Sequence, residues 1–280
     1  MSDIIFVADY FAHQVPGGGE LNNAELIKLL REKGHTVTEI NSYTVDRKFV
    51  EDNAKSNFII ANFVSLAGEA KTALASKKYI IYEHDHKYLA CRNPAMYKNF
   101  IAPIQDIINL DFYSRALAVI CQSTFHEEIV KNNLKINNIL NVGGNLWGLQ
   151  ALDFFVAQCA ITKNSQCSIM DSHIPHKNTS GALKLCHAKD LDYELIPNLP
   201  YYEFLRRLGT NETFIFLPQT PETLGRVVVE ARMMGMKVIT NSFVGATKED
   251  WFKLVGPPLI KQMKQKREDI PELFINLFKS

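Results

Sequence analysis

The sequence predicts an α/β protein with two parallel-sheet domains. Short apolar runs alternate with stretches whose apolar residues recur at helical spacing. Such alternation is typical of right-handed strand–helix–strand units, and therefore of parallel sheets. The alternation pauses near Gly143 and Gly144 and then restarts, and 280 residues suit two domains of roughly 130–150 residues each. We therefore expect two Rossmann-like domains that face each other across a cleft.

The first half of the chain begins with a strand, a glycine loop and a long helix. Residues 20–34 predict the helix, because apolar residues recur every three or four positions and Gly34 follows them. Gly17, Gly18 and Gly19 form the flexible loop before it. The strands expected in this half are IIFVA, HTVTEI, NFIIANF, KYIIYEHDH and LAVICQST.

The second half repeats this alternation. Its expected strands are CSIMDS, YELI, TFIFLP and KVIT, with helices over SGALKLCHAKD and YYEFLRRL. The final stretch, Pro258–Ser280, is predicted to be helical and is basic at KQMKQKRE.

The composition indicates a soluble cytoplasmic protein. Apolar residues make up 46% of the chain, which is enough for two hydrophobic cores. The net charge of +1 supplies no general attraction to nucleic acid or to a membrane. Five cysteines without a CxxC pair favour a reducing compartment. We expect neither a signal peptide nor a transmembrane segment, since no apolar run reaches about 18–20 residues.

The segment around Glu222 and Glu230 carries the strongest functional signal. A strand leads into a Pro/Thr turn, and a helix from about Leu224 to Met234 ends at Gly235 before the strand KVIT. The free N–H groups at the start of a helix suit a phosphate, and carboxylates accept hydrogen bonds from sugar hydroxyls. A nucleotide sugar has this layout, although two glutamates on a solvated helix face are the simpler alternative.

This segment resembles the donor-binding signature of retaining GT-B glycosyltransferases of the family 4 type. The resemblance implies that Glu222 contacts the transferred sugar and that Glu230 holds the ribose hydroxyls. The motif glycine is Gly225, and the amides near Thr223 and Leu224 would bind phosphate. The implied activity is transfer from a nucleotide-diphosphate sugar, with a UDP-sugar favoured and with neither a cofactor nor a metal required. An epimerase or hydrolase of the same fold, and an inactive binding module, are the alternatives.

The resemblance also divides the chain into three parts. Residues 1–145 would form the acceptor-side domain and residues 146–258 the nucleotide-sugar domain. The C-terminal helix, residues 259–280, would return to the first domain.

Two clusters in the first half are further candidates. Gly18 and Gly19 resemble the Gly-Gly-x-Glu loop of such enzymes, where bare backbone can approach a phosphate or an acceptor. A tight surface turn is the alternative. In YEHDH, His84 and Asp85 are our choice for catalysis on the acceptor side, with His86 as the rival. A metal site or a plain polar loop would explain the same residues.

A lysine loop opens the second domain. The related family has an Arg about six residues before a Lys, and both neutralise the donor diphosphate. Here Lys177 is present, but Asp171 stands at the Arg position. Asn178, Ser172 or Arg226 is predicted to supply the missing donor, and a solvated loop lysine is the alternative for Lys177.

The acceptor is predicted from a narrower resemblance. Phage DNA α-glucosyltransferases share a His-Asp pair like His84 and Asp85, so we favour 5-hydroxymethylcytosine in phage DNA, with glucose or a pentose such as arabinose transferred. A polysaccharide or protein acceptor is the alternative. A DNA acceptor requires basic contacts, for which the candidates are Lys87, Arg92, Lys98, Lys261, Lys264, Lys266 and Arg267.

Overall fold

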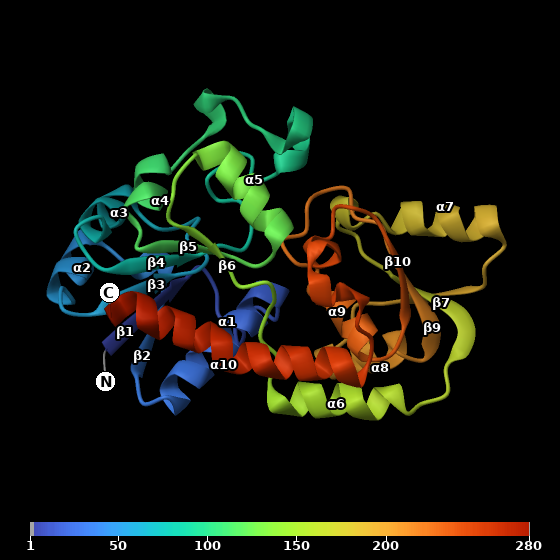
Figure 1. The fold of residues 1–280 in the computed structure, drawn as a ribbon. Helices are drawn as coiled ribbons and strands as arrows, with labels where there is room; N and C mark the ends of the chain where they lie inside the picture. The colour runs from blue at the N-terminus through green and yellow to red at the C-terminus, as the bar shows by residue number, and fades with distance from the viewer. Residues whose placement is uncertain (1–2, 280) are drawn as a thin grey trace. The chain divides into compact units, whose positions relative to one another are not determined.

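The computed structural model of the protein describes residues 3–279. Its contacts divide the chain into two compact units (Figure 1). Unit 1 runs to Leu146 and also includes the chain from Lys266 onward, and unit 2 is Trp147–Gln265. Each unit contains a parallel sheet with helices packed on both faces. The prediction of an α/β fold with two parallel sheets is confirmed.

Unit 1 contains a six-stranded sheet in the order β2-β1-β3-β4-β5-β6. All neighbouring strands are parallel. The strands are β1 (Asp3–Ala8), β2 (Thr36–Asn41), β3 (Asn57–Ile60), β4 (Tyr79–Tyr82), β5 (Ala118–Cys121) and β6 (Ile139–Asn141). From β1 the chain moves first to one side, to β2, and then to the other, to β3. Loops at the carboxyl ends of β1 and β3 therefore diverge, and this switch point is where ligands bind in open α/β sheets.

Helices cover both faces of this sheet. One face packs against α2 (Arg47–Asp52), α3 (Gly68–Leu74), α4 (Leu110–Arg115) and α5 (Thr124–Leu134). The other packs against α1 (Gly18–Glu32) and the last part of α10 (Pro257–Lys279), whose Ile270 and Phe274 are buried in the core. The strands contribute to both cores because side chains alternate along a strand.

Unit 2 contains a four-stranded parallel sheet in the order β10-β9-β7-β8. The strands are β7 (Asn164–Met170), β8 (Tyr193–Ile196), β9 (Asn211–Phe216) and β10 (Lys237–Thr240). One face packs against α6 (Leu149–Cys159), α8 (Tyr201–Leu208), α9 (Arg226–Met233) and the start of α10, and the other against α7 (Thr179–Lys189). The strand order reverses between β7 and β9, which gives unit 2 its own switch point.

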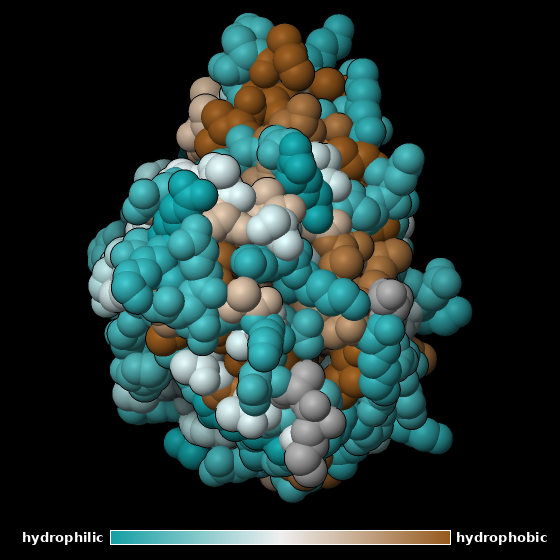
Figure 2. Space-filling view, turned by 90° about the vertical axis from the view of Figure 1, so that its left-hand side faces the viewer, coloured by the Kyte–Doolittle hydropathy of each residue, from teal (hydrophilic) through white to brown (hydrophobic). Residues whose placement is uncertain are grey.

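Between β4 and α4 the chain forms three 3-10 turns, Pro94–Met96, Lys98–Phe100 and Ile104–Asp106. This segment exposes Met96, Ile101 and Ile104. Figure 2 shows a face that is mostly polar, with apolar side chains gathered at its upper end. No helix among residues 3–279 is long and apolar enough to cross a membrane.

Candidate functional site

The switch point of unit 2 brings two of the predicted site residues into contact. Lys177 lies in the loop after β7 and Glu222 in the loop after β9. Two hydrogen bonds hold these loops together, from Gln219 N to His176 O at 2.8 Å and from Asn178 Nδ2 to Leu217 O at 2.8 Å. Because of this, Lys177 Nζ donates to Glu222 Oε1 at 2.7 Å.

The Lys177–Glu222 pair is partly exposed. The side chain of Lys177 is 25% exposed and that of Glu222 is 17% exposed. The Lys177 ammonium also lies 5.6 Å from the ring centre of Phe216, the last residue of β9. A polar ligand can reach both groups, and an anion that bound Lys177 would replace Glu222 as its partner.

Gly225 sets the geometry of the acidic loop. It is the N-cap of α9 with φ of 81°, and a Cβ there would lie 2.7 Å from Val244 Cγ1. The prediction that the helix starts at about Leu224 is wrong by two residues, because α9 begins at Arg226. Thr223 and Leu224 precede the helix, so its first-turn amides lie later in the chain than predicted. Leu224 is buried, and its carbonyl accepts from the next loop.

Glu230 lies in α9 with only 3% of its surface exposed. Its Oε1 accepts hydrogen bonds from Trp147 Nε1 at 2.9 Å, Tyr201 OH at 2.6 Å and Arg226 Nε at 3.0 Å. The Arg226 guanidinium also lies 4.5 Å from the ring centre of Trp147. Burial, and then the charge of Glu230, raise the pKa of Tyr201, so its hydroxyl stays protonated and can donate.

The predicted phosphate donors of unit 2 therefore differ in their availability. The Arg226 side chain is 11% exposed and already contacts Glu230 and Trp147. The Asn178 side chain caps α7, because its Oδ1 accepts a hydrogen bond from Gly181 N at 3.1 Å. Asp171 is exposed after β7. Of the two predicted cationic phosphate ligands, Lys177, with 25% of its side chain exposed, is more accessible than Arg226, with 11%.

Trp147 and Tyr201 were not among the predicted site residues. Both are aromatic residues at the boundary of an element: Trp147 follows the glycine hinge, and Tyr201 begins α8. Their hydrogen-bonding groups meet Glu230 only because α6, which follows Trp147, and α8 both pack against α9 in the core of unit 2.

The switch point of unit 1 holds a second polar cluster. Gly18 begins α1, and a Cβ on Gly19 would lie 3.6 Å from His84 Cγ. Glu20 Oε1 accepts from Asn62 Nδ2, in the loop after β3, at 2.9 Å. Burial raises the pKa of Glu20. The glycine loop and the histidine of YEHDH therefore lie together in the fold.

His84 contacts a side-chain amide at each ring nitrogen. Its Nε2 lies 2.8 Å from Asn23 Oδ1, and its Nδ1 is hydrogen-bonded to Gln122 Nε2. Burial is the main cause that lowers the pKa of His84 to about 3. Asp85 is more exposed and forms ion pairs with Lys87 and with Arg92 Nη1, the latter at 3.1 Å.

Beneath His84 lies a buried charged cluster. Lys87 is only 2% exposed and donates to Glu83 Oε1 at 3.1 Å and to Asp85. Tyr113 OH also donates to Glu83. The rings of His86 and His126 meet edge to face, 5.0 Å apart. His86, the rival catalytic residue, is thus a core residue.

Two of the predicted DNA contacts are wrong. Lys87 is buried within the cluster just described, and Arg267 is 5% exposed and paired with Glu25. Lys266 donates to Val142 O at 2.6 Å. The exposed basic candidates are Arg92, Lys98, Lys261 and Lys264. Within residues 3–279, no group of three or more His, Cys, Asp or Glu side chains could hold a metal ion.

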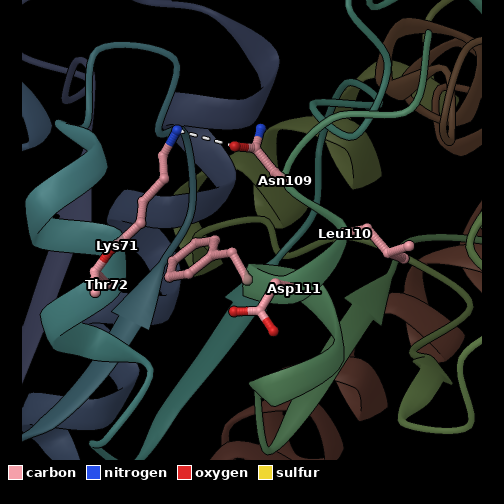
Figure 3. A pocket seen from close by; sticks show the side chains of 6 residues that line it. Lys71, Thr72, Asn109, Leu110 and Asp111 are labelled. Carbon is pink, nitrogen blue, oxygen red and sulfur yellow. Dashed lines mark hydrogen bonds between the residues drawn. The ribbon is translucent and has the colours of Figure 1, made fainter. Parts of the chain in front are cut away.

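One surface pocket of about 270 Å³ contains none of the predicted residues. Lys71, at its wall, donates to Asn109 Oδ1 at 3.1 Å (Figure 3). Burial lowers the pKa of Lys71. The other lining residues are Thr72, Leu110, Asp111 and Phe112.

Two parallel-sheet α/β units in one chain, each with a reversal of strand order, define a GT-B fold. Sucrose-phosphate synthase from Thermosynechococcus elongatus is 10% identical, with a TM-score of 0.62 and 100% of both chains covered. HepE from Anabaena, solved with UDP and glucose, is 14% identical with a TM-score of 0.56, covering 96% of this chain and 90% of HepE.

An α-glucosyltransferase solved with UDP and a 13-mer DNA containing an HMU base is also similar. It is 13% identical with a TM-score of 0.52, and the match covers 97% of this chain and 90% of that one. At these identities the likeness shows a shared fold. No protein-family model and no curated protein sequence matches the chain.

Proposed function

We propose that the protein is a retaining glycosyltransferase that uses a nucleotide-diphosphate sugar, with a UDP-sugar as the favoured donor. The observation that carries this proposal is the Lys177–Glu222 pair at the switch point of unit 2, directly before Gly225 and α9. A cation for phosphate and a carboxylate for sugar hydroxyls then stand side by side, where open α/β sheets bind ligands. The fold shared with HepE and the α-glucosyltransferase, both solved with UDP, supports the same proposal.

In the proposed reaction, the bond between the anomeric carbon and the diphosphate oxygen breaks. A new bond forms to the acceptor oxygen, and the proton of the acceptor hydroxyl passes to the departing diphosphate oxygen. Lys177 and the first-turn amides of α9 stabilise the charge that develops on the leaving diphosphate. Glu222 binds hydroxyls of the transferred sugar. We assign retention of configuration from the resemblance to retaining GT-B enzymes.

Donor binding requires an exchange of partners within unit 2. Before the donor binds, Lys177 is neutralised by Glu222. A diphosphate carries more charge than one carboxylate, so it competes well for the ammonium group. Glu222 is then released to accept from the sugar. We propose that Glu230, held by Trp147 and Tyr201, contacts the ribose once the nucleotide is seated.

We propose 5-hydroxymethylcytosine in phage DNA as the acceptor, with glucose or a pentose transferred. The similar α-glucosyltransferase solved with DNA supports this assignment. Exposed Arg92 and Lys98 lie after β4, beyond the loop that contains His84, and they suit phosphate contacts. His84 and Asp85 would act on the acceptor side. The five free cysteines support a reducing cytoplasmic location.

The test is transfer of sugar mass to DNA. Duplexes with and without 5-hydroxymethylcytosine are incubated with UDP-glucose, UDP-arabinose or the GDP and ADP analogues. The mass of the DNA is then measured by mass spectrometry. We expect a mass gain on the modified duplex alone, with a rate that falls steeply as salt is raised. Donor cleavage with water alone would indicate a hydrolase, and donor binding without cleavage would indicate a binding module. Mass gain on a polysaccharide but not on DNA would show that the acceptor is a polysaccharide.

A further inference from the structure

His84 is fixed by two amides that lie on different elements. Gln122 follows β5, and its Nε2 donates both to Glu83 O at 3.1 Å and to His84 Nδ1. Asn23 lies in α1, and its Oδ1 is 2.8 Å from His84 Nε2. Both amides are almost fully buried. The ring is therefore held from both sides.

The directions of these hydrogen bonds determine where the ring proton lies. An amide nitrogen only donates, so Nδ1 of His84 must accept from Gln122 with its lone pair. The proton therefore lies on Nε2, which donates to Asn23 Oδ1. The second contact of Gln122, to the Glu83 carbonyl, requires a donor and excludes a flipped amide. A protonated ring would place an N–H of Nδ1 against the N–H of Gln122.

The charges around His84 agree with a neutral ring. Lys87 disfavours a proton on the ring, while Glu83 and Asp85 favour one. These two acids are largely neutralised by Lys87 itself. Burial outweighs both influences and lowers the pKa of His84 to about 3.

We propose that Gln122 is a positioning residue that holds His84 as a neutral ring with its proton on Nε2. What this inference implies for catalysis rests on the proposed function. In the transfer reaction, an acceptor or sugar oxygen that replaces Asn23 Oδ1 as the partner of Nε2 then accepts a hydrogen bond from His84. The ring has no free lone pair with which to take the proton of the acceptor hydroxyl.

The test is the protonation state of the ring, measured by NMR without any donor or acceptor. The full chain is labelled with ¹⁵N only at its eight histidines, and His84→Gln identifies the His84 signals by their loss. We expect the pattern of an Nε2–H ring, unchanged from pH 8 to pH 5. In Gln122→Glu the carboxylate accepts from Nδ1–H, so the pKa of His84 should rise by about one to three units.

Gln122→Met provides the second variant, with Gln158→Met as the matched control because Gln158 is a buried glutamine of unit 2. Gln122→Met should let the ring exchange between its two neutral forms, whereas the control should keep the wild-type signals. A proton on Nδ1 in the wild type, or titration near pH 6.5, would overturn the proposal. So would signals in Gln122→Met that match the wild type.

The result separates this inference from the proposed function. If the Nε2–H ring is observed but no sugar is transferred under any condition, the function fails and the role of Gln122 stands. If transfer occurs, Gln122→Glu should change the pH dependence of turnover at unchanged donor affinity. A merely structural effect of the same variant would leave the shape of that pH profile unchanged.

Discussion

The switch points of the two units hold opposite kinds of polar contact. In unit 2, Lys177 binds Glu222 and Arg226 binds Glu230, so each carboxylate has a cation at hydrogen-bond distance. In unit 1, the side chain nearest Gly19 is a histidine held between two neutral amides. An ion pair can exchange one member for a charged ligand, whereas a neutral amide–histidine contact favours uncharged hydroxyls. The difference supports the proposal that the diphosphate binds in unit 2 and that uncharged groups bind in unit 1.

The two units should also differ in how well they tolerate a side chain in place of a key glycine. The largest expected effect on stability is at Gly225. Gly225→Ala should destabilise the protein by about 2–5 kcal/mol, because alanine at positive φ and an overpacked contact with Val244 both add cost. Urea unfolding measures this. Gly68→Ala is the control, since its Cβ would meet nothing within 4 Å. Equal stability of the two variants would contradict the geometry at Gly225.

Acid should destabilise unit 1 before unit 2. His84, His86 and His126 are held neutral in unit 1, with pKa values lowered to about 3, to about 4 and well below 6.5, chiefly by burial. The unfolded chain binds these protons below about pH 6.5, so stability falls from pH 6.5 toward pH 4, by up to about 1.4 kcal/mol per pH unit for each ring.

Hydrogen exchange at pH 7 and pH 5 tests this order of opening. The histidines of unit 2, His173, His176 and His187, are exposed, so its amides should change little. His187→Gln is the control that should leave the response of unit 1 intact. If unit 2 opened first at pH 5, the contrast in buried histidines would not control acid stability.

Removing the accessible cation should weaken nucleotide binding. Lys177→Met should lower the affinity for UDP by about 10–100-fold, since a hydrogen bond to a charged group contributes about 1.5–3 kcal/mol. Calorimetry with UDP measures the change. Lys184→Met, which replaces an exposed lysine in α7, the helix after the Lys177 loop, is the matched control. If both variants bound UDP with the same affinity, Lys177 would not be a ligand of the diphosphate.

Removing the acid of the same pair should act in the opposite direction. Glu222→Gln frees Lys177, so bare UDP should bind a few-fold tighter, a gain of about 1 kcal/mol. Turnover of a UDP-sugar should fall, because the amide replaces the carboxylate that binds the sugar. Calorimetry and a UDP-release assay test the two halves. Weaker binding of UDP would show that Glu222 supports the nucleotide directly.

The smallest change in stability is expected at Gly19. Gly19→Ala places a Cβ 3.6 Å from His84 Cγ, an ordinary contact, so unfolding should change by less than about 0.5 kcal/mol. Turnover should nevertheless fall, because the methyl group occupies space that the proposed ligand needs beside His84. Full activity in Gly19→Ala would mean that no ligand approaches the backbone there.

The local sequence pattern was sufficient to predict the fold class. The alternation of apolar runs with helical periods predicted two parallel sheets, and two such sheets are present. It was less informative about ends and short elements: α9 starts two residues later than predicted, and α6 and the turns after β4 were not predicted. Periodicity is a property of a few consecutive residues, so it identifies regular elements and not irregular connections.

The contacts of the candidate residues were decided by the tertiary structure. Lys177 meets Glu222 across 45 positions, and Glu230 meets Trp147 across 83, because strand order and helix packing bring their elements together. The same packing buries Lys87, which the sequence alone suggests is a surface lysine. Residue types and their spacing determined which chemical groups the chain carries. The order of strands in each sheet determined which groups neutralise one another and which remain accessible to a ligand, because those contacts join residues far apart in the chain.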